Sequence, residues 1–294
     1  MNAGGHKEAR RKMTTVLDAL KAAQERLREI PEPKLDAEYL LAEVLGTSRL
    51  LMLTDKRRQL SPEQERAYDA LLRRRAAREP LQYILGSQSF MGFPLKTDPR
   101  ALIPRNDTEA LCEEALRHLR PGQRALDLCT GTGAIAIALK RLCPGAEVTA
   151  TDLSPDALSL ARENAACLDA AVRFLQGDLF LPVAEESFDL IVSNPPYIPE
   201  GLRGKLQPEV EREPALALFA GRDGMDFYRR IAREAPGYLQ PRGRLLLEAG
   251  DGEAEAVAAL LRENFEEIRV LNDLSGLPRV VGAVKKEAHD GSAV

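Results

Sequence analysis

Residues 124–142 read RALDLCTGTGAIAIALKRL, and this stretch decides the fold class. Residues 124–129 have the apolar character of a buried strand, and residues 130–133, with two glycines, predict a tight turn. Residues 134–142 carry apolar side chains on most faces of a helix, as expected for a helix that packs against a sheet. The stretch therefore predicts a strand, a glycine turn and a helix, which is the repeating unit of an α/β protein.

The glycine turn predicts a site where a ligand approaches the backbone closely at a helix N-terminus. Residues 131–136 also fit the G-x-G-x-x-G/A dinucleotide pattern, so the turn alone leaves the ligand open. Asp152 ends a second strand, residues 147–151, at the spacing of a carboxylate that holds ribose hydroxyls. Asp178 follows a third apolar stretch, where it or its neighbours can meet an adenine amino group or simply form a turn. Together these features predict a nucleoside-containing cofactor.

The tetrapeptide Asn194-Pro195-Pro196-Tyr197 follows the apolar residues 188–193 and predicts a clamp for one planar amino group. The Asn194 side-chain oxygen and the Pro195 carbonyl are two acceptors, which together can fix an NH2 group. The prolines restrict the backbone, and Tyr197 offers an aromatic face to a flat amide or base. The same residue types also terminate strands in general, so this interpretation depends on the cofactor features upstream.

These features all fall directly after successive predicted strands, at the edge where open α/β sheets bind their ligands. In this respect the chain resembles the class I S-adenosylmethionine-dependent methyltransferases, and among them the amino-group methyltransferases with an Asn-Pro-Pro-Tyr loop. Residues 102–109 (LIPRNDTE), 219–226 (FAGRDGMD) and 276–281 (GLPRVV) further resemble the HemK/PrmC family, which methylates glutamine in peptide chain release factors. The resemblance covers about residues 35–285 and is strongest from residue 80 onward.

The resemblance implies a Rossmann-like, seven-stranded sheet whose last strand is antiparallel, with a cofactor site along its edge. Asp152 would hold the ribose of S-adenosylmethionine, and residues near Asp178 and Leu179 would lie beside the adenine. The implied cofactor-binding residues are Asp127, Cys129, Thr130, Gly131, Thr132, Gly133, Asp152, Leu153, Asp178, Leu179 and Asn194. The implied catalytic residues are Asn194, Pro195, Pro196 and Tyr197, with Asn194 touching both cofactor and substrate. Cys129 stands where the family usually has glycine and would be strained at positive φ, and Leu179 replaces a frequent aromatic residue.

The implied reaction is transfer of the sulfonium methyl to the side-chain amide nitrogen of glutamine in the Gly-Gly-Gln motif of a release factor, which leaves S-adenosylhomocysteine. An amide nitrogen is a poor nucleophile, so positioning carries the catalysis, and we infer neither a general base nor a metal. Three alternatives stay open: methylation of a ribosomal-protein glutamine, methylation of DNA adenine N6, and a non-catalytic cofactor-binding scaffold. The predicted catalytic part is net acidic and lacks a basic stripe with interleaved aromatics, so we expect no direct DNA binding.

The predicted organisation has four parts. Residues 1–80 are net basic and read as a small helical bundle for substrate recognition, and residues 81–98 read as a linking β-hairpin. Residues 99–287 form the methyltransferase domain, and residues 288–294 a frayed tail. Within the third part, we predict a helix over 228–238, a strand over 244–248, a helix over 253–264, and closing strands over 267–271 and 279–284.

The composition is that of a globular protein, with 44% apolar residues among 294 and a net charge of −4. No uninterrupted apolar span has the length of a transmembrane helix, so we expect a cytoplasmic protein without membrane contact, and we expect a monomer. The three histidines lie near the termini or on a predicted helix, which disfavours hydrolase triads. Metal-type spacing is missing among the cysteines, which are predicted to be buried free thiols: Cys112, Cys129, Cys143 and Cys167.

Overall fold

The computed structural model describes residues 14–287, and the predicted tail over 288–294 lies outside the described residues. The chain divides into two compact units, with the boundary between Leu85 and Gly86. No helix in the described range combines the length and the apolar character that a membrane crossing requires.

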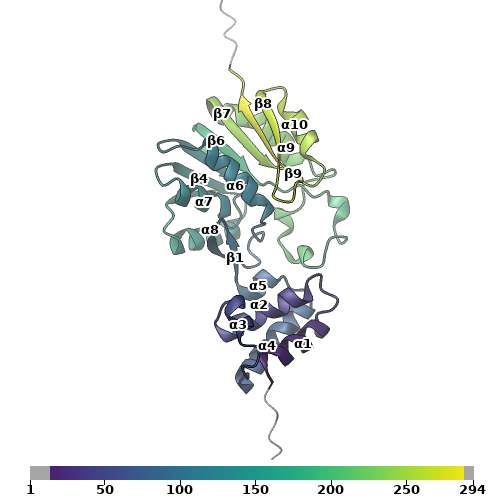
Figure 1. Ribbon diagram of the computed structural model, residues 1–294. Coiled ribbons are helices and arrows are strands. Elements are labelled where there is room, and N and C mark those ends of the chain that lie inside the picture. Colours follow the sequence, from purple (N-terminus) through teal and green to yellow (C-terminus); the bar gives the residue numbers. More distant parts are fainter. Residues whose placement is uncertain (1–13, 288–294) are drawn as a thin grey trace, which may run out of the picture. The chain divides into compact units, whose positions relative to one another are not determined.

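The first unit is helical and has its own apolar core (Figure 1). Its helices are α1 (Val16–Arg26), α2 (Pro33–Leu45), α3 (Arg49–Thr54), α4 (Pro62–Ala76) and α5 (Leu81–Leu85). A capping box begins α4, because the Ser61 and Gln64 side chains each accept from the other residue's backbone N–H group. Arg75 and Asp36 form an ion pair of 2.6 Å inside the unit, with both side chains almost completely buried.

The second unit begins with an antiparallel hairpin of β1 (Ser87–Phe90) and β2 (Phe93–Lys96). The predicted hairpin is therefore wrong for residues 81–85, which form helix α5 in the first unit. The carbonyl of Pro80 accepts from the backbone N–H groups of Tyr83 and Ile84, both at 3.1 Å, and Ile84 packs into the helical core. The apolar side chains that resembled a strand are thus buried by a helical turn.

The main sheet of the second unit has seven strands in the order β5-β4-β3-β6-β7-β9-β8, which confirms the predicted fold class. The strands are β3 (Arg124–Leu128), β4 (Glu147–Asp152), β5 (Val172–Gln176), β6 (Phe188–Ser193), β7 (Leu239–Glu248), β8 (Phe265–Asn272) and β9 (Pro278–Lys285). The first five of these pair in parallel, whereas β9 is antiparallel to both of its neighbours.

Helices cover both faces of this sheet (Figure 1). They are α6 (Asp107–His118), α7 (Ala134–Leu142), α8 (Pro155–Cys167), α9 (Asp226–Glu234) and α10 (Ala254–Leu261). Alternate strand residues point to opposite cores: Leu246 packs with α6 and α7, whereas Leu245 and Leu247 pack with α9 and α10. The four cysteines are free, and burial is confirmed for Cys112 and Cys143. Cys129 is only partly buried and Cys167 is exposed at the last turn of α8, so the predicted burial is wrong for these two.

The parallel registers bring several strand ends to one edge of the sheet. Leu128 pairs with Thr151 on one side and with Ser193 on the other, so the segments after β3, β4 and β6 leave the sheet together. Ser193 in turn pairs with Leu247, which places Asn194 and Glu248 on adjacent strand ends. The fold therefore gathers the polar residues that follow these strands into one region.

Candidate active site

Asp127, in strand β3, stabilises the glycine turn that follows this strand. This carboxylate is fully buried and accepts from the Thr130 hydroxyl at 2.6 Å and from the Ala136 backbone N–H at 3.2 Å. Burial raises the pKa of Asp127 to about 7. A Cβ atom on Gly133 would lie 3.0 Å from the Ile137 side chain, so this glycine permits close packing of the turn.

The turn leads into a first cavity, which we call the cofactor cavity. Seven predicted cofactor-binding residues line it: Cys129, Gly131, Asp152, Leu153, Asp178, Leu179 and Asn194. The remaining four lie behind this lining and support the turn: Asp127, Thr130, Thr132 and Gly133. The family resemblance implied the same role for both groups, because a matching motif cannot tell a lining residue from a supporting one.

Two residues of the cofactor cavity have left-handed backbone without being glycine. Cys129 has φ 58° and Leu179 has φ 47°. Such a conformation costs about 1–2 kcal/mol for a residue with a side chain. The conformation that would strain Cys129 is therefore present in the structure, and both strained positions face the same cavity.

Asp152 is locked between the glycine turn and the start of α8. Its carboxylate accepts from the backbone N–H of Gly131 at 2.8 Å and from that of Ser154 at 2.9 Å. Burial raises its pKa despite these hydrogen bonds. Asp178 is also held, because its carboxylate pairs with Arg230 of α9 at 2.8 Å.

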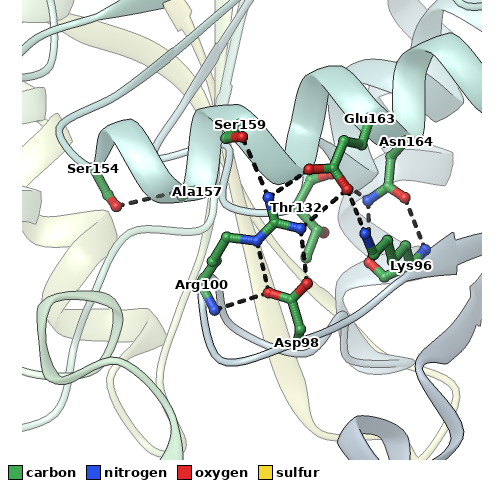
Figure 2. A network of polar contacts seen from close by, with 9 residues as sticks. All are labelled: Lys96, Asp98, Arg100, Thr132, Ser154, Ala157, Ser159, Glu163 and Asn164. Carbon is green, nitrogen blue, oxygen red and sulfur yellow. Dashed lines mark hydrogen bonds and ion pairs between the residues drawn. The ribbon is translucent and has the colours of Figure 1, made fainter.

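Polar side chains of α8 form a network with residues 96–100, the end of the hairpin and the segment that follows it (Figure 2). The Asn164 side chain is 2% exposed; it accepts from the Lys96 backbone N–H at 2.8 Å and donates to the Thr132 carbonyl at 3.0 Å. Asn164 thereby connects the hairpin strand β2 to the glycine turn. Beside it, Arg100 of the cofactor cavity is held by Asp98 at 2.8 Å and Glu163 at 2.6 Å.

The Asn194-Pro195-Pro196-Tyr197 loop stands between the cofactor cavity and a second one, which we call the substrate cavity. Asn194, Pro195 and Tyr197 line the substrate cavity, and Asn194 lines both. The Asn194 side-chain NH2 donates to the Thr108 hydroxyl at 3.1 Å. The side-chain oxygen is thus on the opposite branch of the amide, available as an acceptor.

Tyr197 lies in a close-packed pocket of its own. A Cβ on Gly224 would overlap the Tyr197 carbonyl oxygen, and one on Gly250 would lie 2.9 Å from its ring. Burial, and to a lesser extent the nearby Glu248, raise the pKa of Tyr197 to about 12. The tyrosine is therefore a neutral, immobilised ring at the wall of the substrate cavity.

The outer wall of the substrate cavity comes from residues 198–218. This segment contains three short 3-10 helical turns, Glu200–Leu202, Val210–Arg212 and Ala215–Ala217. Glu213 fastens it to the segment before α6, because its buried carboxylate accepts from the Ile103 backbone N–H at 2.9 Å and pairs with Arg105. Glu213 therefore anchors this segment at the mouth of the site.

Sequence reasoning gave no role to several residues that build this region. Thr108, Glu213 and Arg279 lie in or near the segments that carried the family resemblance, and Glu248 ends β7. Arg279 is 8% exposed and donates to the Ala249 carbonyl at 3.2 Å. The motif segments 102–109 and 276–281 were the available signal, but their contacts with the loop appear only in the fold.

The cofactor cavity has the chemistry of a nucleoside site. The Asp152 carboxylate can accept from hydroxyl groups, while Leu153, Leu179 and Pro196 offer apolar contacts to a base. An α/β sheet with this strand order, a glycine turn after β3 and an Asn-Pro-Pro-Tyr loop after β6 defines a class I methyltransferase.

Comparisons with known proteins give the same class and a narrower family. Residues 18–86 match the family model of the PrmC N-terminal domain, and residues 107–206 match that of the methyltransferase small domain. A methyltransferase structure from Pyrococcus furiosus aligns with 68% of this chain and 92% of its own, at 20% identity and a TM-score of 0.52, and so shares the fold.

Two curated relatives are named release factor glutamine methyltransferase. The protein of Geobacter sulfurreducens is 45% identical over 255 residues, which are 86% of this chain and 90% of that one. The protein of Deinococcus radiodurans is 46% identical over 271 residues, which are 90% of this chain and 97% of that one. The chain belongs to the release factor glutamine methyltransferase family.

Proposed function

We propose that this protein transfers the methyl group of S-adenosylmethionine to the side-chain amide nitrogen of the glutamine in the Gly-Gly-Gln motif of peptide chain release factors. The observation that carries the proposal is the position of Asn194, which lines the cofactor and the substrate cavities at once. A methyl group and its acceptor nitrogen must meet at one point, and Asn194 stands where the two cavities meet. Release factors act on ribosomes, so the proposed place of action is the cytoplasm.

The substrate amide would be oriented by two acceptors of the loop. Because the Asn194 NH2 donates to Thr108, its side-chain oxygen is available to accept from the glutamine NH2, and the Pro195 carbonyl supplies a second acceptor. These contacts would hold the nitrogen in line and stabilise the positive charge that develops on it. Tyr197, whose pKa is raised by burial, would stay neutral and pack against the amide plane.

The cofactor would be held by the residues that the structure places on the first cavity. Asp152 would accept from the ribose hydroxyls, Leu153 and Leu179 would pack against the adenine, and Gly131 would let the ligand approach the turn. When bound, S-adenosylmethionine supplies an electrophilic methyl group. The chain's own task is to bring the substrate nitrogen to it and to exclude water.

The first test is a methyl-transfer assay with labelled S-adenosylmethionine and, separately, release factor, ribosomal protein and unmethylated DNA. We expect label on the Gly-Gly-Gln glutamine, located by peptide mass spectrometry. Label on DNA or ribosomal protein alone would reassign the substrate. No label on any of the three would favour a cofactor-binding scaffold.

The second test is Asn194→Ala. We expect kcat to fall about 100-fold or more, because one of two positioning acceptors is lost, while the cofactor Kd changes less than about tenfold. Asn106→Ala, at an exposed asparagine near the start of α6, is the matched control and should retain activity. Equal turnover by Asn194→Ala and the wild type would refute the mechanism.

A further inference from the structure

Glu248 is a buried carboxylate beside the reactive loop with no role in the mechanism above. It ends β7, is 1% exposed, and its Oε2 atom has no hydrogen-bond partner among the described residues. Since Ser193 and Leu247 pair in register, the following residues, Asn194 and Glu248, leave neighbouring strands side by side. A buried carboxylate in such a place needs a reason, because burial disfavours its charged form.

Thr108 connects the two side chains. It lies in the first turn of α6 and is 5% exposed. Its hydroxyl oxygen accepts from the Asn194 NH2 at 3.1 Å. The same hydroxyl is near enough to the Glu248 carboxylate to lower the pKa of that group. Thr108 therefore lies between Asn194 and Glu248, where one hydroxyl can serve both side chains.

The Glu248 backbone is rigidly held. The Tyr228 hydroxyl donates to the Glu248 carbonyl at 3.0 Å and accepts from the Gly250 backbone N–H at 3.2 Å. Tyr228 is itself completely buried. The backbone that carries Glu248 is thus fixed by a residue of α9, independently of any substrate.

We propose that Glu248 is a positioning residue that, through Thr108, fixes the Asn194 amide with its oxygen toward the substrate nitrogen. The inference rests on the proposed function. An amide presents an acceptor on one branch and donors on the other, and the two branches have nearly the same shape. An ionised carboxylate only accepts, so Thr108 must donate to it and can only accept from the Asn194 NH2.

The direction of these hydrogen bonds depends on the charge of Glu248. A protonated carboxyl can donate to Thr108, and Thr108 can then donate to the Asn194 oxygen, which turns the NH2 toward the substrate NH2. Two donors facing each other cannot bind, so the protonated enzyme is the inactive form. Acid therefore removes activity without removing any catalytic group.

The surroundings of Glu248 place this change in the neutral range. Burial raises its pKa to about 7, against the hydrogen bond from Thr108 and the positive charges of Arg279 and Arg105. Asp107 acts in the same direction as burial. The other titratable groups near it are the phenols of Tyr197 and Tyr228, which are neutral at these pH values because burial raises both of their pKa values.

The test compares Thr108→Val with Thr108→Ser at saturating cofactor and release factor. Valine keeps the shape of threonine but cannot relay a hydrogen bond, whereas serine can. We expect kcat to fall about 10- to 100-fold in Thr108→Val and to stay within about threefold of the wild type in Thr108→Ser. The cofactor Kd and the thermal unfolding temperature report separately on the cofactor cavity and on folding, and both should change little in either variant.

The pH profile provides the second arm. In the wild type, kcat should fall as pH decreases through about 7, and in Glu248→Gln this acid limb should disappear because glutamine does not titrate there. An acid limb that persists in Glu248→Gln, or equal kcat in Thr108→Val and Thr108→Ser, overturns the proposal. A wild type without activity on release factor would instead refute the proposed function, so the two failures are distinguishable.

Discussion

The two cavities that meet at Asn194 are built from different kinds of contact. The cofactor cavity combines short-range and long-range hydrogen bonds. Thr130 and Asp127 are three residues apart and Ser154 and Asp152 are two apart, whereas Gly131 and Asp152 are 21 apart. Around the substrate cavity, the partners are distant. Asn194 and Thr108 are 86 residues apart, and Glu213 and Ile103 are 110 apart.

This difference predicts that the two cavities respond differently to mutation. A turn with local hydrogen bonds loses only part of its support when a distant contact is lost, because its own hydrogen bonds remain. The wall made by residues 198–218 has local hydrogen bonds of its own, in its 3-10 turns, but its attachment to the rest of the domain depends on Glu213 and on the pairing of Ile198 with Phe219. Substitutions that remove the long-range contacts of this wall should therefore affect release-factor use more than cofactor binding.

Among substitutions that separate the two cavities, we expect the largest effect from Glu213→Ala. The change leaves the Ile103 N–H without its acceptor and Arg105 without its anion, so we expect a loss of about 2–3 kcal/mol in the free energy of unfolding. The outer wall of the substrate cavity should loosen. The measurements are denaturant unfolding, kcat/KM for release factor and cofactor Kd, and the second quantity should change most.

The matched control is Glu200→Ala in the same segment. Glu200 is exposed and pairs with Arg203 three residues away, so its loss should leave stability and kcat/KM nearly unchanged. If Glu213→Ala weakened cofactor binding as much as it reduced kcat/KM, the separation between the two cavities would be wrong.

The same difference explains what could be predicted from the sequence. The strand, turn and helix around residues 124–142 were correct because local periodicity and two glycines encode them. The lining residues Asp152 and Asn194 were found because Asp152 ends a strand and Asn194 directly follows one. These signals are all local, as is the hydrogen bond from Thr130 to Asp127 that supports the glycine turn.

The substrate side could not be predicted in the same way. Thr108, Glu213 and Glu248 are ordinary polar residues in their own segments, and their burial arises only when α6, residues 198–218 and β7 come together. Helix α5 was missed for a related reason. Its apolar residues have no local feature that separates a short helix from a strand, and the helical core decides between them.

We expect a smaller effect, on the cofactor cavity, from Asn164→Ala. The substitution removes the bridge between Lys96 and the Thr132 carbonyl and leaves these backbone groups without a partner, which costs about 1–3 kcal/mol. The glycine turn should loosen, so cofactor Kd should rise several-fold while KM for release factor at saturating cofactor stays close to the wild-type value. Isothermal titration and steady-state kinetics measure the two quantities.

Ser159→Ala is the control for that substitution. Ser159 is exposed on the same helix and makes only a 3.3 Å contact with Arg100, so neither quantity should move. An Asn164→Ala variant with unchanged cofactor Kd would show that the turn is held by its own bonds alone, which would sharpen the comparison in the other direction.

We expect the smallest effect from substitutions of Cys129, which test whether strain in the glycine turn is confined to the turn. Cys129→Gly and Cys129→Ala both remove the thiol, but only glycine accepts a φ of 58° without strain. We therefore expect the glycine variant to be more stable than the alanine variant by about 1 kcal/mol, measured by denaturant unfolding. Ala134→Gly, at the first residue of α7, should lower the stability, because a helical position favours alanine over glycine.

Since the strain is confined to one residue of the turn, neither Cys129 variant should alter KM for release factor. A changed KM would mean that the turn and the substrate cavity are mechanically connected, and that the separation at Asn194 fails.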